Sequence, residues 1–288
     1  GDNPLIVHVS CLDEIEPLVR DIPENAKKLM EAFWPGPMTL ILPKSDRIPS
    51  AVSAGLDTVG IRLPASEAAR ELIAASGCPI AAPSANRSGR PSPTTAQHVF
   101  EDMDGRIPMI LDGGASEVGV ESSVIDATGE IPVILRPGGI TPEMVQEVIG
   151  RVSVDEHVMS PLSEGDIVRS PGMKYKHYAP NAQVFVVVGE AQAAAARLSA
   201  LYDQFAAAGK RPYIAATAEA MPFYGPRRCA LLGTRRDPTT LCSRLFSLLR
   251  ELDQEADVIL SEGIGTEGTG LAFMNRLLRS AGFRVEYL

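Results

Sequence analysis

The stretch Gln183-Val-Phe-Val-Val-Val188 is a continuous apolar strand, and an alanine-rich helix follows it at 191–208 and ends before Gly209. An apolar strand followed by a helix is typical of a parallel sheet that is covered on both faces. The same alternation predicts further strands at 212–216, 229–232, 257–261 and 284–287, and helices at 238–251 and 269–280. Residues 181–288 therefore predict a small α/β domain with an open, twisted parallel sheet.

Upstream of this domain, strands and helices alternate less regularly. Strands are predicted at 5–9, 38–42, 59–63, 79–82, 109–112, 122–126 and 133–136, and helices at 23–33, 66–75 and 141–149. The last two strands are spaced as a hairpin, and Thr141 with Pro142 supplies a start signal for the last helix. Residues 1–150 therefore predict a second α/β domain, with a curved or open-barrel mixed sheet and helices packed around it.

The segment between the two domains, residues 151–180, shows no periodicity and is interpreted as an interdomain linker. Its second half carries Lys174, Tyr175, Lys176, His177 and Tyr178. Such side chains can stack on a ring and neutralise phosphate. They either cover a ligand or fix the linker to a domain.

A polar loop punctuated by prolines follows the predicted strand at 79–82. Its hydroxyl, carboxamide and guanidinium groups are close together in sequence, and its prolines restrict the backbone before any ligand binds. Donors ordered in this way suit phosphate or carboxylate oxygens. The loop is therefore a ligand-binding loop or a surface loop whose polar side chains satisfy their own turn.

A second loop, at 262–270, is rich in glycine and lies between a predicted strand and a predicted helix. It does not supply Gly-x-Gly-x-x-Gly spacing directly after the first strand of the domain, where dinucleotide-binding folds have it, so it is a weak signature of such a site. It either cradles an anion or serves as a structural loop or domain contact.

Composition limits the classes of function. The formal net charge of the 288 residues is −9. An acidic chain without a long run of Lys or Arg is a poor candidate for strong direct binding to nucleic acid. The four cysteines are scattered, which fits reduced thiols in a cytoplasm and predicts neither a metal site nor disulfides. No apolar run approaches the roughly 18 residues that span a bilayer, so we expect a soluble cytoplasmic protein without a membrane partner.

Several separate motifs together carry a family resemblance. They are Asn3-Pro-Leu-Ile-Val-His8, Phe33-Trp-Pro-Gly-Pro-Met-Thr-Leu40, Val59-Gly-Ile-Arg62-Leu-Pro64, Ala82-Pro-Ser-Ala-Asn86, Gly119-Val-Glu-Ser-Ser123-Val124, Leu135-Arg-Pro-Gly138 and Ser170-Pro-Gly-Met-Lys-Tyr-Lys-His-Tyr-Ala-Pro180. The chain resembles the Sua5 branch of the Sua5/YrdC/YwlC family, the L-threonylcarbamoyladenylate synthases. The resemblance implies a YrdC-like mixed-sheet catalytic domain and a Rossmann-like Sua5 domain. A Lys-x-Arg-Pro element precedes the first motif in the family, so we expect that an N-terminal portion is missing here.

The family's reaction converts L-threonine, bicarbonate or carbon dioxide, and ATP to threonylcarbamoyl-AMP and pyrophosphate. A transferase partner then moves the threonylcarbamoyl group to adenosine 37 of tRNAs that read codons beginning with A. The resemblance therefore implies a nucleotidyltransferase whose substrate is ATP, with Mg²⁺ bound through the triphosphate and not in a protein cage. Positioning and charge stabilisation would supply the acceleration, so no catalytic nucleophile is expected.

The resemblance also implies which residues line the two sides of the pocket. The threonine side would be lined by His8, Arg62, Ser84 and Ser123, with the Arg62 guanidinium on the threonine carboxylate. The ATP side would be lined by Asn3, Thr58, Asn86, Thr94, Arg136 and Tyr178. Tyr178 would close over the nucleotide as a lid.

Two other classes of function compete with this interpretation. One is an RNA-binding module of the YrdC type, which the acidic charge disfavours. The other is a different ATP-dependent carbamoyl- or acyl-transfer enzyme, such as an accessory domain of a hydrogenase-maturation carbamoyltransferase. The linker and the second domain disfavour this alternative.

Overall fold

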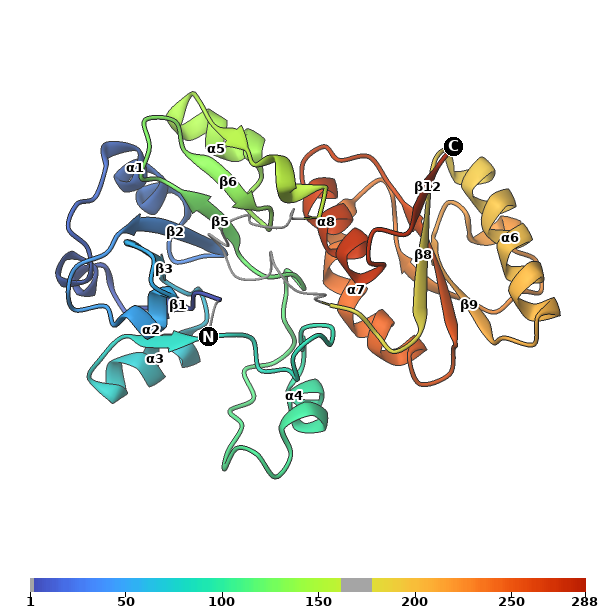
Figure 1. Ribbon diagram of the computed structural model, residues 1–288, viewed down its shortest axis with the longest axis horizontal. Helices are drawn as coiled ribbons and strands as arrows, with labels where there is room; N and C mark the ends of the chain where they lie inside the picture. Colours follow the sequence, from blue (N-terminus) through green and yellow to red (C-terminus); the bar gives the residue numbers. More distant parts are fainter. Residues whose placement is uncertain (1–2, 162–177) are drawn as a thin grey trace. The chain divides into compact units, whose positions relative to one another are not determined.

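The computed structural model describes residues 3–161 and 178–288 (Figure 1). These residues divide into two compact units, each of which has its own sheet. The first unit comprises the described residues 3–84 and 121–161, and the second comprises 85–120 and 178–288. Across the described ranges, no helix is long and apolar enough to cross a membrane.

The first unit contains a seven-stranded mixed sheet, which confirms the predicted fold class. Its strands, in spatial order, are β4 (Ile80–Ala82), β1 (Ile6–His8), β3 (Thr58–Arg62), β2 (Met38–Pro43), β5 (Ser123–Asp126), β6 (Val133–Arg136) and β7 (Ser153–Val154). The pairs β1–β3, β2–β5 and β6–β7 are parallel, and the other neighbours are antiparallel. The predicted hairpin is the pair β5–β6.

The main core of this unit lies on one face of the sheet. Leu40, Ile61 and Ile125 are paired neighbours on β2, β3 and β5, and they pack with Leu29 and Val145. These last two residues belong to the helices α1 (Glu24–Phe33) and α5 (Pro142–Ile149) (Figure 1). Because side chains alternate along a strand, the residues beside these core positions turn to the opposite face.

The remaining elements of the first unit are two helices and three 3₁₀ turns. They are η1 (Leu12–Glu14), η2 (Glu16–Leu18), α2 (Ser50–Ser53), α3 (Glu67–Ser76) and η3 (Glu156–Val158). Helix caps agree with the sequence: the Ser66 hydroxyl accepts from the Ala69 N–H at the start of α3, and the Thr141 hydroxyl accepts from the Met144 N–H at the start of α5. The short strand β7 lies within the segment 151–180 that was interpreted as the interdomain linker.

The second unit contains a five-stranded sheet in which every neighbouring pair is parallel. Its order is β10 (Cys229–Gly233), β9 (Pro212–Thr217), β11 (Val258–Gly263), β8 (Gln183–Val188) and β12 (Val285–Tyr287). The helix α6 (Ala191–Ala207) lies on one side of the sheet, and α7 (Pro238–Leu252) and α8 (Gly270–Ser280) lie on the other, with the short η4 (Met221–Phe223) after β9 (Figure 1). The prediction of an open parallel sheet is confirmed.

The segment 85–120 runs from β4 to β5 of the first sheet in sequence, yet it groups with the second unit. It contains α4 (Ala96–Met103), which starts at Thr95 and which the sequence did not predict. The predicted strand at 109–112 is wrong. The structure has no strand there, and Met109 and Leu111 are 69% and 59% exposed. Apolar composition alone could not supply the partner strand that a β-strand needs.

Candidate functional site

A row of residues crosses the first sheet at one end of its strands. His8 of β1 lies beside Arg62 of β3. The antiparallel register of β2 and β3 places Thr39 next to Arg62 in turn, and Val124 of β5 lies between Thr39 and Arg136 of β6. The sheet therefore brings two predicted threonine ligands and one predicted ATP ligand to the same end, although they are far apart in sequence.

Arg62 and Arg136 interact electrostatically in this row. Burial and, to a smaller extent, the positive charge of Arg136 together lower the pKa of Arg62 to about 10. The Arg62 Nε donates to the Gly36 carbonyl oxygen at 3.1 Å, and within the described part of the chain it forms no ion pair. The positive charges of Arg62 and Arg136 repel each other, and a bound anion would offset this repulsion.

Arg136 is held by Ser122. Its Nε donates to the Ser122 carbonyl oxygen at 3.0 Å, and its Nη2 donates to the Ser122 Oγ at 3.1 Å. The Ser122 hydroxyl also lies 2.8 Å from the Thr39 hydroxyl. A shift of register between β5 and β6 leaves Leu135 and Arg136 both opposite Val124. Such a bulge redirects a side chain at the end of a strand.

Ser123 makes different contacts from its neighbour Ser122. Its hydroxyl is fully buried, donates to the Ile140 carbonyl oxygen at 2.6 Å and accepts from the Ile140 N–H at 3.0 Å. It pairs across the sheet with Met38, which belongs to the main core. Sequence reasoning selected Ser123 and missed Ser122 and Thr39. The threonine-binding role of Ser123 stays a prediction.

His8 brings a neutral imidazole to the row. Burial and, to a smaller extent, the positive charge of Arg62 lower its pKa to about 4. Its Nδ1 is buried without a hydrogen-bond partner among the residues described. A neutral ring with a free nitrogen can exchange a hydrogen bond with a ligand.

The opposite end of the same strands carries a second group of predicted ligands. Thr58 and Arg62 share the face that lies away from the core, about 13 Å apart along β3. Because β1 is parallel to β3, Asn3 precedes β1 at the Thr58 end, and Ser84 follows the antiparallel β4 at that end as well. The structure therefore separates Ser84 from the Arg62 row, with which the threonine assignment grouped it.

Gly60 separates the two ends. It lies between Thr58 and Arg62 on the same face, and a Cβ there would approach the Thr39 Cγ2 to 3.2 Å. Because Gly60 has no side chain, β3 carries no bulky group between Thr58 and Arg62 on this face. A ligand could lie along β3 from one polar end to the other.

Three predicted ATP ligands, Asn86, Thr94 and Tyr178, belong to the second unit. The Asn86 Nδ2 donates to the carbonyl oxygens of Arg87 at 2.9 Å and Arg90 at 3.3 Å. The Thr94 side chain is buried, and its N–H and hydroxyl each lie 3.3 Å from the His98 Nδ1.

Tyr178 is packed inside the second unit. Its side chain is 5% exposed, its ring stacks on Phe246 of α7 with 5.1 Å between centroids, and the Arg276 guanidinium lies 5.7 Å from the ring centre. A lid role would need these contacts to change, and it stays a prediction. The linker residues 174–177 lie outside the described residues.

Orphaned polar atoms coincide with the predicted ligands. Four buried side-chain polar atoms have no hydrogen-bond partner within the described ranges, and three of them are the Asn3 Oδ1, the His8 Nδ1 and the Asn86 Oδ1. A buried polar atom without a partner costs about 1–3 kcal/mol, so a bound ligand that supplies the partner is the simplest explanation for each. Three of the ten predicted ligand residues thus carry a buried polar atom that a ligand could satisfy, and the assignment of all ten stays a prediction.

The other candidate sites have less evidence for a bound ligand. Glu262, which begins the predicted glycine-rich loop, lies in β11 and is fully buried. It accepts hydrogen bonds from the Thr217 N–H and hydroxyl, the Tyr224 hydroxyl and Arg235. These bonds favour the structural role for that side chain. Residues 3–161 and 178–288 contain no group of three or more His, Cys, Asp or Glu that could hold a metal ion.

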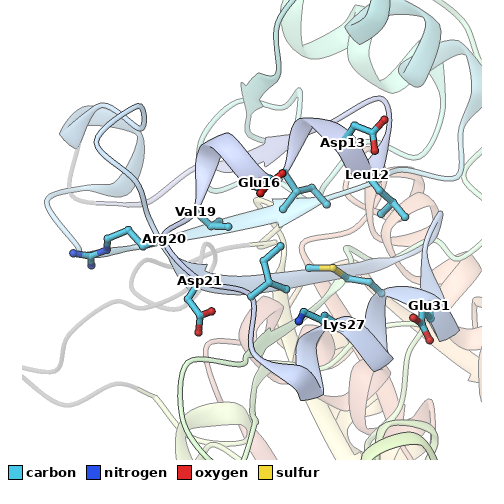
Figure 2. A pocket seen from close by; sticks show the side chains of 11 residues that line it. Leu12, Asp13, Glu16, Val19, Arg20, Asp21, Lys27 and Glu31 are labelled. Atoms are coloured by element: carbon cyan, nitrogen blue, oxygen red, sulfur yellow. The ribbon is translucent and has the colours of Figure 1, made fainter.

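A cavity of about 530 Å³ lies beside η1, η2 and α1 (Figure 2). Asp13, Glu16, Asp21, Lys27 and Glu31 are among the residues that line it. None of the predicted ligand residues lines it. It is therefore separate from the Arg62 row.

Comparison with known proteins connects these observations to a family. Residues 1–138 match the Sua5/YciO/YrdC family model, described as "Telomere recombination", and residues 140–282 match the model "Threonylcarbamoyl-AMP synthase, C-terminal domain". The threonylcarbamoyl-AMP synthase of Pyrococcus abyssi is 44% identical over 99% of this chain and 82% of its own length. That of Bacillus subtilis is 46% identical over 99% of this chain and 81% of its own length.

The chain belongs to the threonylcarbamoyl-AMP synthase family. The resemblance predicted from the motifs is confirmed. Synthases of this family use ATP as a substrate. A solved structure of P. abyssi Sua5 complexed with L-threonine is 43% identical and superposes with a TM-score of 0.92, covering 100% of this chain and 82% of that one. A double-alanine variant of the same protein gives a TM-score of 0.93 at 42% identity, covering 100% and 81%.

Proposed function

We propose that this chain forms threonylcarbamoyl-AMP and pyrophosphate from L-threonine, bicarbonate or carbon dioxide, and ATP. The observation that carries the proposal is the pair Arg62 and Arg136, whose neighbouring charges lie at one end of the sheet. The threonine carboxylate, the carbamate, ATP and the product all carry negative charge that such a pair would attract. The family membership and the threonine complex of the P. abyssi relative support the same reaction.

On the threonine side, the Arg62 guanidinium binds the carboxylate. Its Nε is engaged with Gly36, which fixes the orientation of the group and leaves both terminal nitrogens for a bidentate contact. The neutral His8 exchanges a hydrogen bond with the amino acid through its free Nδ1. The motifs also assign Ser84 and Ser123 to this side, but Ser84 follows β4 at the Thr58 end and the Ser123 hydroxyl bonds to Ile140, so Ser122, beside Arg136, is the hydroxyl that we expect at this end.

On the ATP side, Arg136 neutralises phosphate charge, and Asn3 and Thr58 supply polar groups at the far end of β3. Asn86 contributes its free Oδ1, which accepts hydrogen bonds but cannot donate them. Its partner on the nucleotide is therefore a ribose hydroxyl or the adenine amino group and not a phosphate oxygen. Thr94 and Tyr178 are the other nucleotide contacts. Mg²⁺ binds through the triphosphate.

The reaction needs positioning more than a reactive side chain. The threonine amino nitrogen forms a bond to the carbon of carbon dioxide and loses a proton, or to that of bicarbonate with loss of water, and this gives a carbamate. A carbamate oxygen then attacks the α-phosphorus of ATP. The bond from this phosphorus to the pyrophosphate oxygen breaks, and the electron pair leaves with pyrophosphate. Fixed guanidinium groups stabilise the charge that develops on the phosphoryl oxygens. No protein nucleophile takes part.

The product then serves a tRNA threonylcarbamoyl transferase, which modifies adenosine 37 of tRNAs reading codons that begin with A. We propose that the chain itself binds tRNA weakly at most, because its net charge is −9. A cytoplasmic location fits its cysteines, which are all free.

The direct test is pyrophosphate release from ATP by the full-length protein with bicarbonate. We expect release that depends on L-threonine. Equal release with serine, or without any amino acid, would remove the threonine assignment. Tight tRNA binding without pyrophosphate release would favour the RNA-binding alternative.

A further inference from the structure

The segment 85–120 is fixed to helix α7 by a buried ion pair. The Arg250 Nη2 donates to the Asp102 Oδ2 at 2.7 Å, and Arg250 Nε and Nη2 both donate to the Pro91 carbonyl oxygen, at 3.1 and 2.6 Å. The Asp102 side chain is fully buried and that of Arg250 is 7% exposed. A pair so far from water is held much more rigidly than a surface ion pair.

Asp102 also holds the loop that precedes it. Its Oδ1 accepts from the Arg90 Nη1 at 2.6 Å, and its Oδ2 accepts from the Arg87 N–H at 3.3 Å. The Arg87 Nε donates to the Asp102 carbonyl oxygen at 3.2 Å. Burial alone would raise the pKa of Asp102, but its bonds to Arg250 and Arg90 outweigh that effect and keep the pKa below its ordinary value. The Asp102 carboxylate is therefore charged, and both of its oxygens accept hydrogen bonds.

The same loop determines which way Asn86 faces. Its amide nitrogen donates to the carbonyl oxygens of Arg87 and Arg90, the two residues that Asp102 holds. Carbonyl oxygens only accept, so the amide cannot be turned over without losing both bonds. The Oδ1 is left buried and without a partner in the described structure. The Asn86 acceptor is thus presented by a chain of bonds that begins at Arg250.

The far end of the segment is fixed to the same helix. Gly119 has a φ of +76°, and a Cβ at this position would lie 2.3 Å from the Ser243 Cα and 2.5 Å from the Cys242 carbonyl oxygen. No other residue type fits that approach without a shift of backbone. Both ends of the segment therefore depend on α7.

We propose that Arg250 is a positioning residue for nucleotide recognition. Through Asp102 it holds Arg87 and Arg90, and these orient Asn86 so that its Oδ1 accepts a hydrogen bond from the ribose or the adenine amino group. The identity of the ligand rests on the proposed function; the positioning of Asn86 does not. In this proposal the loop at 86–90 contributes directly to ATP affinity.

The test compares Arg250→Met with Arg244→Met in the full-length protein. Arg244 lies on the same helix and pairs with Glu251 on the surface, where both side chains are about half exposed, so its loss is a matched control. We expect Arg250→Met to raise the KM for ATP at least ten-fold while the KM for threonine changes less than two-fold. Arg244→Met should leave both within two-fold. Arg250→Lys keeps the positive charge but lacks the forked guanidinium group. Its KM for ATP should therefore lie between those of Arg250→Met and Arg244→Met.

A double-mutant cycle with Asn86→Ala shows whether Arg250 acts through Asn86. If it does, Arg250→Met adds less than two-fold to the KM for ATP in the Asn86→Ala background. Full additivity overturns the proposal, as does an unchanged KM for ATP in Arg250→Met. Should Arg250→Met not fold, Arg250→Lys takes its place in the cycle under the same criteria.

Hydrogen exchange of the backbone amides at 86–90 tests the positioning without any reaction. Faster exchange in the Arg250 variant than in Arg244→Met supports it, and equal exchange overturns it. If the wild-type protein shows no threonine-dependent pyrophosphate release, the proposed function fails, whereas this exchange result still decides the role of Arg250.

Discussion

The hydroxyl oxygens of Thr39 and Ser122 lie 2.8 Å apart, and both side chains are buried. The Ser122 hydroxyl also accepts a hydrogen bond from Arg136, so the three side chains form one network that joins β2 to the β5–β6 hairpin. The next residue, Ser123, turns its hydroxyl to Ile140 instead. Two consecutive serines therefore have different tasks at the edge of the site.

Ser122→Ala and Ser123→Ala are expected to separate these tasks. Ser122→Ala removes the hydroxyl that accepts from the Arg136 Nη2 and keeps the carbonyl that accepts from its Nε. We expect a KM for ATP raised about ten-fold, from the loss of one charge-assisted hydrogen bond worth about 1.5 kcal/mol. Ser123→Ala leaves the Ile140 N–H and carbonyl unpaired and should lower the free energy of unfolding by about 1–3 kcal/mol. Urea unfolding and steady-state kinetics measure both effects. A raised KM for threonine in Ser123→Ala would instead support the role that its motif implies.

Arg62→Met is expected to weaken the binding of threonine much more than the binding of ATP. The change removes the group assigned to the carboxylate, and a bidentate charged contact of this kind contributes about 3 kcal/mol, or roughly a hundred-fold in KM for threonine. Arg70→Met is a suitable control, since the Arg70 guanidinium donates to carbonyl oxygens at 64 and 65 outside the row. Equal rises in both KM values would remove Arg62 from the threonine side.

The lowered pKa of His8 predicts that the stability of the protein depends on pH. Its pKa is lowered from 6.5 to about 4 in the folded protein, so the unfolded chain binds the proton more readily between these values. The stabilisation is therefore complete above pH 6.5 and is lost as the pH falls toward 4, by up to about 3 kcal/mol. Urea unfolding at pH 7 and pH 4.5 of the wild type and of His8→Gln measures it. If the two proteins lose the same stability over this interval, His8 is not the group responsible.

Gly60 predicts a steric effect on the site. Gly60→Val places a branched side chain between Thr58 and Arg62, where even a Cβ would lie 3.2 Å from Thr39. We expect activity to fall at least ten-fold, while Gly113→Ala, at a glycine whose Cβ would meet nothing within 4 Å, changes it less than two-fold. Pyrophosphate release and a thermal melt separate a blocked site from an unfolded protein. Full activity in a folded Gly60→Val protein would show that no substrate lies over this position.

Glu262 predicts a large effect on the stability of the second unit. Glu262→Gln neutralises a buried carboxylate that binds Arg235, Thr217 and Tyr224, and breaking such a pair costs about 3–5 kcal/mol. Glu255→Gln, which disrupts an exposed pair with Arg228, should cost less than about 1 kcal/mol. Thermal unfolding of both variants checks this. A similar melting temperature for the two would contradict the structural role of Glu262.

Local patterns predicted most of the secondary structure. The apolar run at 183–188, the helix that follows it and the cap at Thr141 depend on side-chain periodicity and on backbone groups close in sequence, and each appears in the structure. The motifs also identified the family. The exception at 109–112 shows the limit, because an apolar run forms a strand only where another strand accepts its hydrogen bonds.

The sequence by itself determined the fold class, the family and the residue types that such a reaction needs. Only the tertiary structure decided how they meet: that Arg62 and Arg136 share one end of a sheet, that Ser122 and not Ser123 bonds to Arg136, and that the Asn86 loop is held by Arg250 of a distant helix. The physical reason is the same in each case. Strand register and buried ion pairs join residues far apart in the chain, and neither is encoded in a local pattern.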